Sequence, residues 1–206
     1  SKYKEHIHIC CTSEDINNIA YSLMIKEGRD LLIYHANMLQ RTMKSMGKKY
    51  KNIAMLSHTH GQPASPTTMG KEFIIFYRRL HAQIDDLSNI EIKGKFNGAT
   101  GNYSAHSVTY PKVNWPNTMR KFVNSLKLEY NSHTTQIEPH DYIADLCHKI
   151  NHINSILIGF SQDVWAYISK NYFTQKNIRG EIGSSTMPYK INPINFENAE
   201  GNLGMS

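Results

Sequence analysis

The sequence predicts a mainly α fold, a bundle of long helices, on three observations. Three stretches repeat apolar residues every three or four positions, and the one from Ser13 to about Gly47 alone would form a helix about 50 Å long. No convincing alternating strand appears apart from short apolar pieces such as residues 53–56. Helices this long exceed what one chain of 206 residues can cover. We therefore expect the chain to self-associate into a larger helical bundle.

Local residue preferences place the starts of the long helices. Ser13 is expected to cap the first helix, because its hydroxyl can accept a hydrogen bond from a free backbone N–H. Ser65 is expected to cap the second helix, with Pro66 in its first position, where the missing proline N–H costs nothing. The third helix is expected to start at Pro139 for the same reason.

Shorter helices and polar connections complete the predicted architecture. One short helix is expected over residues 117–127, and another from Pro193 behind Asn192 as its cap. Function usually lies on the connections of a rigid scaffold. The connections richest in Gly, Pro, Ser, Thr and His are Ser57–Pro66, Gly94–His106 and Asn171–Pro193.

Composition excludes several classes of protein. The net charge is +6, but the only tight basic cluster is Lys48–Lys51, at a predicted helix end where the helix dipole favours cations. A nucleic-acid partner is therefore not expected. No apolar run approaches the roughly 20 residues that span a bilayer, so no membrane association is expected either. Three cysteines without a C-x-x-C pair favour a reducing, cytoplasmic location.

The most specific stretch is Gly183–Pro193, which reads G-S-S-T-M-P-Y-K-I-N-P. Breaking a bond β to a carboxylate produces a doubly charged intermediate that needs prearranged hydrogen-bond donors. Lys190 and Asn192 supply a cation and an amide near the start of a helix, whose positive dipole end adds to them. The stretch resembles the G-S-S-x-M-P-x-K-x-N loop of the fumarase/aspartase superfamily. That resemblance implies a catalytic role for Lys190, substrate contact for Asn192 and Ser185, and a general base in Ser184, although physics alone does not choose between the two serines.

The segment Ser57–Pro66 contains a second candidate, the H-x-H pair of His58 and His60. Taken alone, the pair fits a metal site or two polar loop residues about as well as it fits catalysis. Beside the serine loop, the segment resembles the T-H-G-Q motif of adenylosuccinate lyases. The resemblance implies that His60 is the general acid, that Glu197 orients and charges its imidazole, and that Thr59 contacts substrate. Many relatives have Arg at the position of His58, which does not affect His60.

Two further segments resemble the same family. Residues 8–18 contain T-S-E-D-I-N-N, and residues 134–141 read T-T-Q-I-E-P-H-D. Residues 98–102 form a Gly-rich loop of the superfamily, to which we assign only a role in shaping the pocket. The residues that the resemblance places in substrate binding in these segments are Thr12, Ser13, Gln136 and His8, and it adds Asn198, which follows the serine loop.

The resemblance implies an activity and an assembly. The activity is elimination of fumarate from adenylosuccinate to give AMP, and from the succinylated aminoimidazole-carboxamide ribotide, in purine nucleotide biosynthesis. The family needs no metal and no organic cofactor. It forms a homotetramer whose long helices build a common core and whose active sites are shared between chains. Residues 1–206 are expected to be the central helical-bundle domain of such an enzyme, without the N-terminal and C-terminal domains of the full-length protein.

Two other functions stay open at this point. The first is a catalytically inactive structural relative, which the presence of Ser184, His60, Lys190 and Glu197 disfavours. The second is a metal-dependent hydrolase built on histidines. His148 and His152 have helical i, i+4 spacing, but the following glutamate of the H-E-x-x-H motif is missing.

Overall fold

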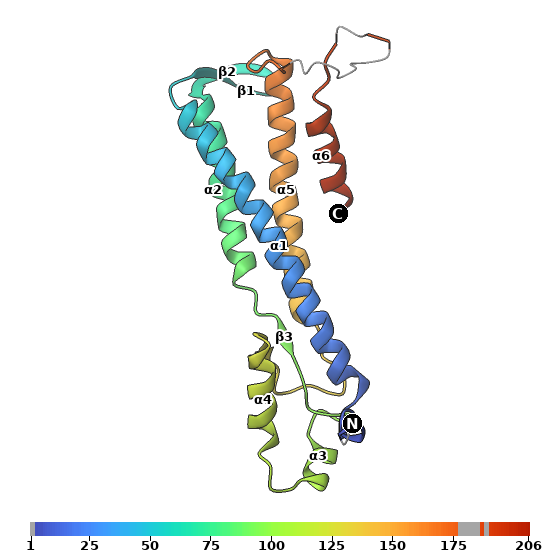
Figure 1. Ribbon diagram of the computed structural model, residues 1–206. Coiled ribbons are helices and arrows are strands. Elements are labelled where there is room, and N and C mark those ends of the chain that lie inside the picture. The colour runs from blue at the N-terminus through green and yellow to red at the C-terminus, as the bar shows by residue number, and fades with distance from the viewer. Residues whose placement is uncertain (1–2, 177–185, 188–189) are drawn as a thin grey trace. The chain divides into compact units, whose positions relative to one another are not determined.

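The computed structural model describes residues 3–176, 186–187 and 190–206, and this part of the chain is mostly helical (Figure 1). The long helices are α1 (Ser13–Lys49), α2 (Met69–Ser88) and α5 (Asp141–Ser169), of 37, 20 and 29 residues. The shorter helical elements are η1 (Lys4–His6), α3 (Ser104–Thr109), α4 (Trp115–Ser125) and α6 (Ile194–Met205). The predicted mainly α class is confirmed. None of the helices described is long and apolar enough to cross a membrane.

Four short strands accompany the helices in the part of the chain that the structure describes. Strand β1 (Ala54–Thr59) pairs antiparallel with β2 (Gln62–Thr68), and β3 (Lys93–Gly94) pairs parallel with β4 (Glu129–Tyr130). The apolar piece at residues 53–56 was the only sequence hint of these strands, and most of it lies in β1. The β1–β2 ribbon replaces the open connection expected between the first two long helices.

The predicted start of the second helix was wrong. Ser65 and Pro66 lie in β2, where Pro66 stands opposite Leu56. A two-stranded ribbon has only edge strands, so a proline without an N–H can face away from its partner at no cost. The cap of α2 is instead Thr68, whose Oγ1 accepts a hydrogen bond from the backbone N–H of Lys71 at 3.3 Å.

Two helices begin slightly earlier than predicted, because other residues cap them. Helix α1 has Ser13 as its first residue, so the cap position belongs to Thr12. The backbone N–H of Thr12 donates to Oδ2 of Asp15 at 3.0 Å, the contact of a capping box. Helix α4 begins at residue 115 rather than 117, since the side chain of Asn114 accepts from the N–H of Asn117 at 3.2 Å.

Two other helices begin later than predicted. Helix α5 does not include Pro139, because His140 has a φ of 60° and so lies outside the helical region. Helix α6 starts one residue after Pro193, which occupies the cap position without a side-chain cap bond. Asn192 is therefore not the cap of this helix.

The chain forms two compact units, each with its own core. The first comprises Ser1–Tyr34 and Leu87–Cys147, and the second comprises His35–Asp86 and His148–Ser206. In the first, the buried cluster consists of Ile19, Ile92, Phe96, Val123, Leu128, Tyr130 and Tyr142. In the second, Phe160 of α5 meets Phe73 and Phe76 of α2 edge-to-face, with ring centroids 5.8 and 5.2 Å apart. Helices α1 and α5 contribute to both units.

Helices α1 and α2 cross in the second unit where two glycines meet. A Cβ on Gly70 would lie 2.4 Å from the carbonyl oxygen of Gly47 and 2.5 Å from Cα of Lys51. Both contacts are to backbone, which cannot move aside as a flexible side chain does. We predict that Gly70→Ala lowers the free energy of unfolding by about 1–3 kcal/mol, as overpacking does in other cores. Urea denaturation of the intact protein measures the change.

Gly28 offers a matched control for this substitution. It also lies in a helix, but a Cβ there would have no atom within 4 Å. Gly28→Ala should therefore raise the free energy of unfolding by up to about 1 kcal/mol, because alanine favours the helical backbone. Equal effects of the two substitutions would show that the crossing does not depend on the missing side chain.

Candidate functional site

Two of the predicted substrate-binding residues meet in the first unit. Gln136, on the connection before α5, donates a hydrogen bond from Nε2 to Oγ1 of Thr12 at the start of α1, at 3.0 Å. The residues are 124 positions apart in the sequence. Gln136 is exposed and Thr12 is half-buried, so the pair lies at the surface. Ser13 and His8 are also exposed, on the segment around the same helix start.

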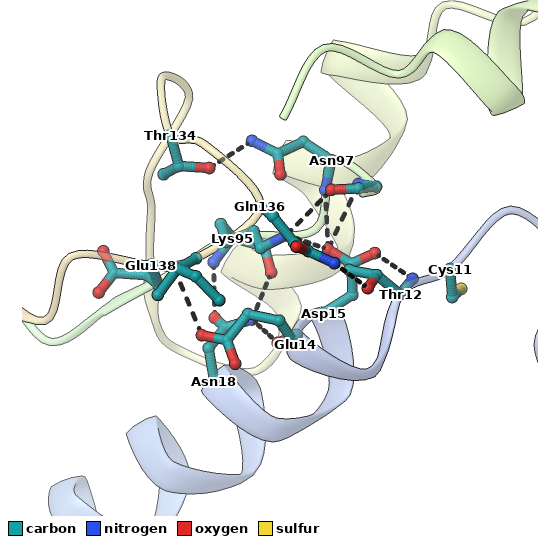
Figure 2. Close-up of polar contacts among 12 residues, drawn as sticks. Cys11, Thr12, Glu14, Asp15, Asn18, Lys95, Asn97, Thr134, Gln136 and Glu138 are labelled. Carbon is teal, nitrogen blue, oxygen red and sulfur yellow. Dashed lines mark hydrogen bonds and ion pairs between the residues drawn. The ribbon is translucent and has the colours of Figure 1, made fainter. Parts of the chain in front are cut away.

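The connection that carries Gln136 is held on both sides of this residue (Figure 2). Thr134 accepts a hydrogen bond through Oγ1 from Nδ2 of Asn97 at 2.8 Å. Glu138 is almost fully buried, and its carboxylate accepts from Nδ2 of Asn131 at 2.8 Å and from the backbone N–H of His140 at 2.5 Å. Gln136 therefore lies between two fixed points, although its own side chain faces solvent.

The Gly-rich loop at residues 98–102 packs against the same connection. Gly101 has a φ of +73°, and a Cβ on it would lie 2.0 Å from the carbonyl oxygen of Thr134. Only glycine fits both the backbone conformation and this close approach. The close packing of this loop thus limits how near the connection can lie to the start of α1.

His106 of α3 lies beneath the same loop. Its side chain is 2% exposed, and neither ring nitrogen has a hydrogen-bond partner among the described residues. Its ring packs edge-on against those of Trp115 and Tyr103, with centroids 4.9 and 5.6 Å apart. Burial lowers the pKa of the imidazole below its ordinary value of 6.5, while the nearby carboxylate of Asp15 opposes this shift. The folded protein therefore favours the neutral form of His106 more than the unfolded chain does.

This neutral histidine makes stability depend on pH. Below about pH 6.5 the unfolded chain binds a proton at residue 106 that the folded chain resists. The stabilisation is complete above pH 6.5 and is lost as the pH falls below it, by at most about 1.4 kcal/mol per pH unit. We predict that His106→Phe, which keeps the ring packing, reduces this loss. Urea denaturation between pH 7.5 and 5.5 tests it, and identical pH slopes for both proteins would contradict it.

In the second unit, His60 occupies the tip of the β1–β2 hairpin. Thr59 pairs with Gln62, so the turn contains only His60 and Gly61, with φ values of 53° and 73°. Two central residues with positive φ are typical of the tight turns that suit the twist of a hairpin. Positive φ is uncommon for a residue with a side chain. The turn holds the imidazole of His60 exposed at the end of the ribbon.

The base of this hairpin is anchored. The hydroxyl of Tyr172 makes hydrogen bonds to both the N–H and the carbonyl oxygen of Leu56, each at 3.2 Å. Oγ of Ser57 donates to the carbonyl oxygen of Ser65 across the ribbon at 2.6 Å. His60 is thus exposed at the end of a ribbon that side-chain hydrogen bonds hold at its base.

The predicted residues that follow the serine loop lie on and before α6. Glu197 and Asn198 are exposed in its first turns, and Asn192 is half-buried just before it. Lys190 is exposed, and its backbone N–H donates to the carbonyl oxygen of Met187 at 2.9 Å. Ser184 and Ser185 lie outside the described residues.

The candidate residues fall into both units. Thr12, Ser13, Gln136 and His8 belong to the first, and Thr59, His60, Lys190, Asn192, Glu197 and Asn198 to the second. No hydrogen bond or ion pair in the described part of the chain joins His60 to Glu197. Among the same residues, no group of three or more His, Cys, Asp or Glu is placed to hold a metal ion.

A protein-family model described as Lyase matches residues 1–205. The chain belongs to this Lyase family. Among its curated relatives, the adenylosuccinate lyase of Buchnera aphidicola from Schizaphis graminum is 56% identical over 207 residues, which cover 100% of this chain and 45% of the relative. The adenylosuccinate lyase of Escherichia coli K12 is 52% identical over 203 residues, covering 98% and 44%. The chain thus spans less than half the length of these curated relatives.

Solved structures show the same fold at low identity. A 3-carboxy-cis,cis-muconate lactonizing enzyme from Pseudomonas putida superposes with a TM-score of 0.81 at 20% identity, over 98% of this chain and 45% of that one. A fumarate lyase from Mesorhizobium sp. BNC1 gives 0.79 at 17% identity, over 100% and 45%. This Lyase-family chain therefore shares its helical fold with these two enzymes, which agrees with the predicted long-helix bundle.

The buried polar residues beneath Thr12 in this Lyase-family chain were not predicted from the sequence. Asp15, Lys95 and Asn97 are each 0% exposed, and Glu138 is 1% exposed. One clue was present, since Asp15 stands three residues after Thr12, the spacing of a capping box. Nothing in the sequence distinguishes Lys95 from an ordinary surface lysine, because long-range contacts alone bury it.

Proposed function

We propose that this chain is the central helical portion of an adenylosuccinate lyase, which removes fumarate from adenylosuccinate to give AMP. The observation that carries this proposal is the 56% identity, along the whole chain, to a protein called adenylosuccinate lyase. We extend the proposal to the succinylated aminoimidazole-carboxamide ribotide, which carries the same succinyl group on nitrogen. The location we propose is the cytoplasm.

In the proposed reaction, Ser184 acts as its alkoxide and removes a proton from the carbon next to a carboxylate of the succinyl group. The resulting negative charge is stabilised by the ammonium of Lys190 and by the N-terminus of α6. The C–N bond then breaks, and His60, oriented by Glu197, gives a proton to the departing nitrogen. The products are fumarate and AMP, so the reaction balances without a metal or an organic cofactor.

The remaining candidates are proposed to bind the nucleotide. The contact between Thr12 and Gln136 supports a shared role for these two side chains, since one ligand at the surface could touch both. The exposed hairpin tip supports substrate access to Thr59 and His60. The complete proposed binding set is Thr12, Ser13, Thr59, Gln136, Ser185, Asn192, Asn198 and His8.

Incubation of the intact enzyme with adenylosuccinate tests the activity. Fumarate and AMP should appear in equal amounts, and the rate should be unchanged by dialysis against a metal chelator. The same assay with the succinylated ribotide tests the second substrate. An enzyme that releases no fumarate from either compound would contradict the proposal.

We also propose that the intact enzyme is a homotetramer with active sites shared between chains. One face of α1 supports this proposal, because Met24, Leu31 and Met38 recur at seven-residue steps and are 67%, 60% and 50% exposed. Apolar residues at this spacing form the seam between packed helices. Sedimentation equilibrium of the intact enzyme should give four times the chain mass, whereas a stable monomer would contradict the proposal.

A further inference from the structure

An ion pair is buried beneath Thr12, at the centre of the contacts in Figure 2. Nζ of Lys95 lies 2.8 Å from Oδ1 of Asp15, and both side chains are 0% exposed. Removing two charges from water costs more free energy than their attraction returns, unless further hydrogen bonds satisfy both groups. An apolar pair of similar volume usually stabilises a fold equally well. We therefore look for the role of this pair in the backbone segments that its hydrogen bonds hold in place.

The carboxylate of Asp15 binds the backbone of two separate segments. Its Oδ2 accepts from the N–H of Thr12 at 3.0 Å. Its Oδ1 accepts from the N–H groups of Asn97 and Gly98, at 3.2 and 3.3 Å. Lys95 also bonds to the same loop, since its Nζ donates to the carbonyl oxygen of Gly98 at 3.1 Å. One buried pair thus fixes the start of α1 against the Gly-rich loop.

From this centre the contacts reach the surface at Gln136. Asn97, whose backbone is held by Asp15, donates from its side chain to Thr134 at 2.8 Å. Two residues later, Gln136 donates to the hydroxyl of Thr12. Because Asp15 also bonds the N–H of Thr12, these contacts form a closed circuit through Asp15, Asn97, Thr134, Gln136 and Thr12. The path from the ion pair to Gln136 thus consists of two hydrogen bonds, at Asn97 and Thr134, and two residues of chain, and only its last contact, between Gln136 and Thr12, is exposed.

We propose that Asp15 and Lys95 are positioning residues for substrate binding, which set the separation and orientation of Thr12 and Gln136. This inference rests on the proposed function, in which those two residues contact the nucleotide. Neither Asp15 nor Lys95 reaches solvent, so they act through the residues above them. A carboxylate is required because it offers acceptors on both oxygens, for the N–H of Thr12 on one and the N–H groups of the loop on the other.

The substitution Asp15→Asn tests the proposal in the intact enzyme. Asparagine has nearly the same shape but only one acceptor oxygen, so its NH2 group would face a backbone N–H or the Lys95 ammonium. We expect KM for adenylosuccinate to rise about tenfold, with kcat changed by less than about twofold, because binding rather than chemistry is disturbed. On a background that carries both Thr12→Ala and Gln136→Ala, the same substitution should raise KM by less than about twofold, since both residues through which Asp15 acts are then removed.

Ser22→Ala is the matched control for a purely structural effect. Ser22 is also 0% exposed in α1 and bonds to the carbonyl oxygen of Lys93 at 2.6 Å and to the hydroxyl of Tyr142 at 3.0 Å, but not to the segments that hold Thr12 and Gln136. The substitution Ser22→Ala should lower the thermal stability of the enzyme and leave KM for adenylosuccinate at the wild-type value.

The outcomes separate the two proposals. If Asp15→Asn does not fold, Thr134→Val gives the same test at the half-buried end of the circuit, with a KM rise of about threefold that vanishes on the Gln136→Ala background. Wild-type KM in a folded Asp15→Asn or Thr134→Val enzyme overturns the positioning role. The role is also overturned if KM rises as much on the substituted background as in the otherwise wild-type enzyme, or if Ser22→Ala raises KM equally. A wild-type enzyme that does not cleave adenylosuccinate overturns the proposed function and, with it, the substrate contacts of Thr12 and Gln136.

Discussion

Replacing Ser184 by Ala in the intact enzyme should lower turnover by about 10²–10⁴-fold while adenylosuccinate still binds. The reason is chemical, since the hydrogen to be removed is very weakly acidic and alanine has no group to accept it. The cation at Lys190 and the N-terminus of α6 remain available to hold the carboxylate of the substrate. Turnover is measured as fumarate release, and binding is measured by calorimetry with the slow variant.

Ser185→Ala is the matched control, because it removes the same hydroxyl from the next residue. Ser185 is proposed to bind substrate, so its loss should weaken binding more than it slows the bound complex. Near-normal turnover of Ser184→Ala would remove Ser184 as the base. If Ser185→Ala were then the inactive variant, the base would be Ser185, a choice that the sequence alone did not make.

The long helices were predictable because their information is local. Apolar periodicity placed α1 to within two residues at its C-terminal end, and the preference of proline for a first turn placed the start of α5 to within two residues. The error at Ser65 and Pro66 has the opposite cause. A serine followed by a proline fits the start of a helix and an edge strand equally well. The choice was made by pairing with β1, a contact that no local pattern contains.

The same distinction applies to the candidate site. The resemblance predicted that Thr12 and Gln136 bind substrate, and the structure places their side chains in contact although 124 positions separate them in the sequence. It did not identify Asp15 and Lys95, because a lysine is rarely buried and nothing near residue 95 marks it as an exception. Their role depends on three segments meeting in space. Sequence motifs therefore find groups at a surface more readily than the buried groups that position them.

The second large effect concerns acid catalysis by His60. We expect His60→Gln to lower turnover at least about a hundredfold, since glutamine cannot give a proton to the departing nitrogen. His58→Gln is the matched control two residues away, where the same change removes a side chain whose Nδ1 lies 3.1 Å from the carbonyl oxygen of Leu56. His58→Gln should leave turnover within a few-fold of wild type. Turnover of both variants is measured at saturating adenylosuccinate.

The role of Glu197 is tested by combining substitutions. If Glu197 acts by orienting His60, Glu197→Gln alone should lower turnover, but adding it to His60→Gln should cost little more, because both residues serve one function. Both side chains are exposed within this chain, which leaves them free to meet across a contact between chains. Mixing an inactive His60 variant with an inactive Ser184 variant should then restore part of the activity, since some sites would receive both intact residues. Fully additive losses together with no recovery on mixing would contradict both the pairing of His60 with Glu197 and the sharing of sites between chains.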